Sequence, residues 1–74
     1  MNNYTMSEKL SVVRHWFARR NGLEYSQVTA KIIAETDENY TLEINKNGKI
    51  SSVTWLKVFF DEFTASVLDE HIYD

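Results

Sequence analysis

The chain has 74 residues, of which 43% are hydrophobic and 14% aromatic, and its formal net charge is −3. This length predicts one domain over residues 1–74, and so apolar a composition is not that of a disordered polypeptide. The absence of cysteine excludes disulfides and Cys/His zinc sites. The sequence also has no apolar run of the roughly 18 residues that a membrane-spanning helix needs.

The first predicted element is a helix at about residues 6–21. Thr5 and Glu8 have the spacing of a capping box at its start. Asn21-Gly22 follows as a stop signal, because glycine readily adopts the left-handed conformation that ends many helices. The apolar residues of this segment recur with the helical period and form one stripe: Met6, Leu10, Val13 and Phe17.

The next segment, residues 26–34, changes to the period of a strand. Val28, Ala30, Ile32 and Ala34 point to one side, and only Ile33 breaks the alternation with polar residues. A polar turn then leads to a second alternating strand that begins at Tyr40.

Asn47-Gly48 is a strong signal for a tight hairpin turn. A two-residue turn pairs Lys46 with Lys49 and sets Leu42 opposite Val53, Tyr40 opposite Trp55, and Ile50 on the outer face. A three-residue turn with a bulge pairs Ile44 with Ile50 instead. We favour the two-residue turn because it joins two large apolar pairs across the strands.

The last predicted element is a helix from about Thr54 to Ile72, with Leu56, Phe60, Phe63 and Val67 as its apolar stripe. The element order is therefore α-β-β-β-α. We expect an α+β fold, a small two-layer domain in which a three-stranded antiparallel sheet packs against two helices. Both helices should cover the sheet face of Val28, Leu42 and Val53.

No catalytic motif is evident. The only histidines, His15 and His71, have no nucleophile at a recognisable spacing, and there is no glycine-rich phosphate loop. Asp69, Glu70, His71 and Asp74 could form a metal cluster, but an acidic C-terminal turn is the simpler interpretation. We therefore predict a protein that is not an enzyme and that needs neither a cofactor nor a metal.

Several apolar residues fall outside the stripes, and a small two-layer domain cannot cover them all. They are Val12, Trp16, Ile33, Ile50, Trp55, Phe59, Leu68 and Ile72. Contiguous exposed apolar side chains mark interaction surfaces, and aromatic residues are frequent anchors there. We predict Trp16, Trp55 and Phe59 as the anchors of a partner-binding site.

Charge is unevenly divided along the chain. Residues 1–31 carry a net charge of +3 and residues 32–74 a net charge of −6. In the second predicted helix, an acidic ridge would keep the protein soluble, or would steer it onto a basic partner surface. Its residues are Asp61, Glu62, Asp69 and Glu70.

Arg14, Arg19 and Arg20 surround Trp16 and suggest an alternative function, nucleic-acid binding through the first helix. Three arginines make a small patch on an acidic protein, whereas nucleic-acid-binding domains are usually basic. The layout of a three-stranded sheet followed by a helix is similar to that of certain DNA-binding integrase arm domains. Those domains have basic strands, whereas here Lys46 and Lys49 are accompanied by Glu43.

The leading interpretation is a protein-binding module, acting as a regulator, adaptor or inhibitor of a larger macromolecule, with a homodimer as a further expectation. A short, acidic, cysteine-free and aromatic-rich chain resembles small phage-encoded proteins that block host or defence enzymes. That resemblance implies a viral protein in the host cytoplasm. The absence of a secretory signal pattern at the start of the chain also favours a cytoplasmic location.

Overall fold

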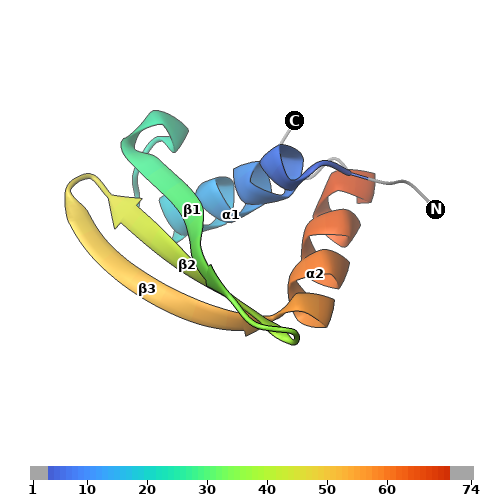
Figure 1. Cartoon of the computed structure of the whole chain (residues 1–74). Helices are drawn as coiled ribbons and strands as arrows, with labels where there is room; N and C mark the ends of the chain where they lie inside the picture. The colour runs from blue at the N-terminus through green and yellow to red at the C-terminus, as the bar shows by residue number, and fades with distance from the viewer. Residues whose placement is uncertain (1–3, 71–74) are drawn as a thin grey trace.

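The computed structural model describes residues 4–70 and confirms the predicted α-β-β-β-α fold (Figure 1). The three strands form one antiparallel sheet in the order β1-β2-β3. A short 3₁₀ turn, η1, precedes the first strand, so that β1 begins two residues later than predicted. The elements are α1 (Met6–Arg20), η1 (Tyr25–Gln27), β1 (Val28–Glu35), β2 (Asn39–Lys46), β3 (Lys49–Leu56) and α2 (Lys57–Glu70).

Helix α1 has the predicted signals at both ends. The Glu8 N–H donates to Thr5 Oγ1 at 3.1 Å, and the Thr5 N–H donates to Glu8 Oε1 at 2.9 Å, which completes the capping box. At the other end Gly22 has φ +66°, and the Leu23 N–H donates to the Ala18 carbonyl at 2.8 Å. This is a Schellman ending, which glycine favours because it has no Cβ to clash in the left-handed conformation.

The predicted two-residue hairpin turn is confirmed. Lys46 pairs with Lys49, and Asn47 and Gly48 have φ values of +55° and +97°. Both central residues of a type I′ turn need positive φ, and the twist of that turn matches the twist of the strands. Tyr40 therefore lies opposite Trp55, as expected, and the alternative register with a three-residue turn is wrong.

A β-bulge in β1 explains why Ile33 breaks the alternation. Ile32 pairs with Leu42 and Ala34 with Thr41, so Ile33 is the extra residue between them. The bulge moves Ala34 to the outer face with Thr41, and the prediction that it shares a face with Val28 is wrong.

The predicted start of the second helix at Thr54 is also wrong. β3 continues to Leu56 because Trp55 and Leu56 still pair with β2, and α2 begins at the next residue. Leu56 consequently lies on the outer face of the sheet and is 56% exposed, so it does not belong to the helical stripe. The predicted end of the helix at Ile72 lies outside the described residues.

The two helices pack against the sheet unequally. Helix α1 lies across β1 and β2, whereas α2 stands at the end of the sheet where β3 finishes and packs against α1 (Figure 1). The core between them consists of Val13, Ala18, Val28, Leu42, Ile44 and Phe60. Val53 of β3 is only half-buried, because no helix lies over the middle of this strand.

Val12, which the sequence placed among the surplus apolar residues, is buried. It lies one helical turn beyond Lys9, whose ammonium pairs with Asp61 of α2 at 2.8 Å. Val12 is therefore on the side of α1 that faces α2, where the two helices pack together.

The position of Phe60 gives a test of the fold. Phe60 is fully buried, and its ring centroid lies 5.3 Å from that of Tyr40. Phe60→Ala should lower the free energy of unfolding by about 3–5 kcal/mol, because it leaves a cavity in the core. The control Val58→Ala, at a position that is 67% exposed, should change it by less than about 0.5 kcal/mol. Urea denaturation of both variants measures the difference, and equal effects would contradict this packing.

Candidate binding surface

Five aromatic rings from three different elements form a continuous cluster beside β3. The ring centroids of Trp55 and Phe59 lie 5.7 Å apart, and those of Phe59 and Phe63 lie 5.9 Å apart. Trp16 lies edge-on to Phe63 with the ring centroids 6.4 Å apart, and Phe17 stacks on Trp55 with the centroids 6.5 Å apart. We call this cluster of Trp16, Phe17, Trp55, Phe59 and Phe63 the aromatic surface.

The local sequence explains why these rings meet. Trp55 points to the inner face just before β3 ends, and α2 starts two residues later. Phe59 and Phe63 are four residues apart, so they lie on one side of α2, next to Trp55. The aromatic surface is partly accessible: Phe59 is 51% exposed and the other four rings are half-buried.

The three predicted anchors, Trp16, Trp55 and Phe59, are therefore brought together in space. Sequence reasoning missed Phe17 and Phe63, because both belong to helical stripes that were assigned entirely to the core. Their half-burial shows that the edge of each stripe extends beyond the core.

Two cations lie against the aromatic surface. The guanidinium carbon of Arg20 is 4.6 Å from the centroid of the Trp16 ring, and Lys46 Nζ is 5.9 Å from that of Phe17. Such cation–π contacts contribute about 0.5–1 kcal/mol where the groups are exposed. Within residues 4–70 neither cation forms an ion pair, so this side of the aromatic surface is basic.

The four acids of the predicted ridge on α2 have different surroundings. Asp61 pairs with Lys9, and the Tyr4 hydroxyl donates to Asp69, so both acids connect α2 to the N-terminal part of the chain. Glu62 and Glu70 are exposed, and Glu70 accepts a hydrogen bond from the Ser66 hydroxyl at 3.2 Å.

Arg14 is occupied by contacts within the fold. Its Nε donates to the Val28 carbonyl at 2.7 Å and its Nη1 to the Tyr25 hydroxyl at 2.8 Å, while its guanidinium lies over the Tyr25 ring. Arg20 packs on Trp16 instead, and Arg19 is exposed in the last turn of α1. The three arginines of the nucleic-acid alternative therefore do not form one patch.

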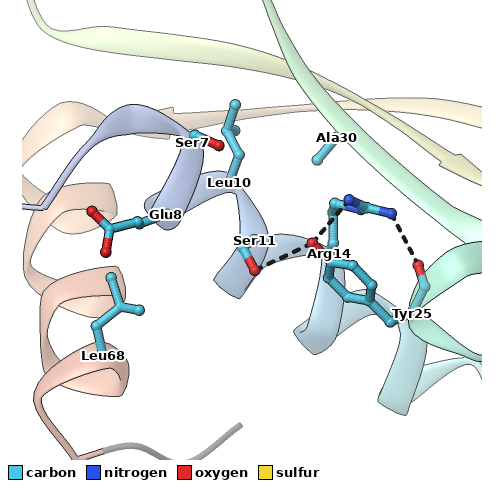
Figure 2. A pocket seen from close by; sticks show the side chains of 8 residues that line it. All are labelled: Ser7, Glu8, Leu10, Ser11, Arg14, Tyr25, Ala30 and Leu68. Atoms are coloured by element: carbon cyan, nitrogen blue, oxygen red, sulfur yellow. Dashed lines mark hydrogen bonds between the residues drawn. The ribbon is translucent and has the colours of Figure 1, made fainter. Parts of the chain in front are cut away.

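A shallow pocket of about 600 Å³ opens between α1 and β1, away from the aromatic surface (Figure 2). The Tyr25 hydroxyl lies between Arg14 and Ser11 and donates to Ser11 Oγ at 3.3 Å. Glu8, the only carboxylate of the lining, caps α1. Arg14, Tyr25 and Ser11 thus bind one another, and Glu8 binds Thr5. The lining residues are Ser7, Glu8, Leu10, Ser11, Arg14, Tyr25, Ala30 and Leu68.

The part of the chain that the structure describes contains no group of three or more His, Asp or Glu side chains that could hold a metal. His71 and Asp74 of the considered metal cluster lie outside it. None of the helices between residues 4 and 70 has the length and apolar content to cross a membrane.

The contacts of Arg14 and Arg20 predict different effects on stability. Arg14→Ala removes hydrogen bonds that join α1 to η1 and β1, so it should lower the free energy of unfolding by about 1–3 kcal/mol. Arg20→Ala removes one exposed cation–π contact and should cost less than about 1 kcal/mol. Chemical denaturation compares the two, and a larger cost for Arg20→Ala would contradict the assignment.

His15 predicts a pH dependence. Its ring stacks on Tyr25 with the centroids 4.1 Å apart. Its pKa is lowered, first by burial and then by the positive charges of Arg14 and Arg19. The unfolded chain therefore binds this proton more readily, and stability is lost as the pH falls through the unfolded pKa of about 6.5.

Denaturation midpoints at about pH 8 and pH 5.5 measure this effect, because that range spans the titration of an unfolded histidine. The drop in midpoint should be smaller in His15→Gln than in the unsubstituted protein. An identical drop in both proteins would assign the pH dependence to other groups.

No family model, curated protein or solved structure matches the chain. The aromatic surface, with Arg20 and Lys46 beside it, is the feature that most needs a functional explanation.

Proposed function

We propose that the protein is a non-enzymatic protein-binding module, a regulator, adaptor or inhibitor, that docks on a larger protein through the aromatic surface. One observation carries this proposal. Five rings from α1, β3 and α2 are contiguous, and Phe59, the most accessible of them, is 51% exposed. The next residue, Phe60, is fully buried, so the two phenylalanines face opposite environments.

Burial of the aromatic surface would supply binding energy at a low entropic cost. An aromatic side chain has few rotatable bonds, and each ring here already packs against at least one other. Trp, Tyr and Arg are the residue types that most often dominate protein–protein interfaces. Trp16, Trp55 and Arg20 meet that description, and Phe59 adds the most accessible apolar area.

The charges around the aromatic surface indicate which charges a partner would carry. Arg20 and Lys46 lie on the α1 side, and Glu62 and Glu70 are exposed on α2. We expect the partner to present an apolar patch with acidic residues facing Arg20 and Lys46. Such complementarity mainly raises the association rate and specificity, and salt weakens the effect.

Phe59 and Val58 allow a matched test of this proposal. The protein, immobilised through an added tag, is used to capture partners from nuclease-treated lysate, and the captured partner is then titrated. Phe59→Ala should weaken binding about 30-fold, which corresponds to the 2 kcal/mol typical of a true anchor. Val58→Ala removes a neighbouring apolar side chain that is 67% exposed and lies outside the aromatic surface, so affinity should not change.

Two results would contradict the proposal. Equal binding by wild type and Phe59→Ala would place the contact elsewhere on the molecule. Capture of material only from lysate that has not been treated with nuclease, together with steep weakening of binding by salt, would indicate nucleic-acid binding instead.

A further inference from the structure

The two edge strands of the sheet differ in how they are protected. β1 contains the bulge at Ile33 and the charged Lys31, and the Val28 carbonyl at its start accepts from Arg14. Bulges, charges and covering side chains are the features by which natural proteins prevent an edge strand from pairing with another chain. β1 therefore has three obstacles to pairing along its length.

β3 has none of these obstacles. It pairs with β2 in continuous register from Lys49 to Leu56, and residues 50–56 contain no charge, proline or bulge. Lys46 and Lys49 flank a two-residue turn, so they form a hydrogen-bonded pair, and the pairs alternate from there. The N–H and C=O groups of Ile50, Ser52 and Thr54 consequently point away from β2, and no backbone group within residues 4–70 bonds to them.

We propose that this edge binds a second copy of the chain, with the two β3 strands antiparallel and related by a two-fold axis at Val53. In this register Val53 faces Val53 of the second copy, and Ser52 faces Thr54. Ile50 of each copy then lies opposite Leu56 of the other, which gives two equivalent pairs, one on each side of the axis. The proposal does not depend on the proposed function of the aromatic surface.

The exposed side chains select this register. Ile50 and Leu56 are 64% and 56% exposed on the outer face of the same strand, and pairing them would cover both. A shift by one residue would place the inner face of one copy beside the outer face of the other. A shift by two residues would set Leu56 opposite Ser52 or Gly48, where it has no apolar partner.

The charges at the two ends of β3 are compatible with this pairing. The same register sets Lys49 of one copy opposite Lys57, the first residue of α2, of the other. Lys57, the cation at that end, points away from the edge, since its ammonium pairs with Glu35 and lies 5.1 Å from the centroid of the Tyr40 ring. Because the exposed apolar side chains of β3 complement one another in this register, a second copy fits the edge better than an unrelated strand does.

The full-length chain can be tested by sedimentation over a range of concentrations. We expect a monomer–dimer equilibrium, with a dissociation constant at least about tenfold higher in Ser52→Pro, because proline removes an outward N–H that β2 does not use. Circular dichroism checks that this variant is folded. The control Ile33→Lys, at a similarly exposed apolar position on β1, should dimerise like the wild type.

A pair of variants tests the register without altering the backbone. Ile50→Lys and Leu56→Glu should each weaken the dimer, because each sets a charge against an apolar side chain. Mixed together, they should form a heterodimer with one ion pair and one intact apolar pair. A wild type that stays monomeric at every concentration, a Ser52→Pro variant that dimerises as tightly, or a mixture that fails to associate would each overturn the proposal.

Discussion

The direct junction between β3 and α2 is the constraint on which the rest of this structure depends. Leu56 is the last residue of the strand and Lys57 the first of the helix, so the chain has no loop with which to turn back over the sheet. The Lys57 N–H donates to the Glu38 carbonyl at 2.8 Å, and the Lys57 ammonium pairs with Glu35. These contacts fix the start of α2 against the turn between β1 and β2, so α2 remains at the end of the sheet (Figure 1).

Both proposed interaction sites follow from this constraint. Since α1 lies over β1 and β2, the inner face of β3 at Trp55 is covered by aromatic rings rather than by a helix lying across the strand. The Trp55 ring connects the two helices, because it contacts Phe17 of α1 and Phe59 of α2. The open edge of the same strand lies next to these rings, so a β3-mediated dimer would present two aromatic surfaces on one side of a continuous sheet.

The sequence predicted elements whose signals are local and missed those decided by tertiary contacts. The Thr5–Glu8 capping box and the Asn47-Gly48 turn are complete within a few residues, and both were correct. At Leu56 two periods overlap, because this residue fits the strand alternation and also the helical spacing to Phe60, and only the pairing with Asn39 decides between them. Arg14 was a candidate only in the alternative nucleic-acid interpretation, and its contact with Tyr25 could not be predicted because it depends on the path of the chain after α1.

Residue-resolved hydrogen exchange of the β3 amides tests the central claim that β3 is the unprotected strand through which the molecule meets a partner. At low protein concentration the amides of Ser51, Val53 and Trp55 should be protected, because they bond to β2, while those of Ser52 and Thr54 should exchange rapidly. At high concentration the second group should also become protected. Strong protection of Ser52 and Thr54 in dilute solution, or rapid exchange at every concentration, would contradict the account.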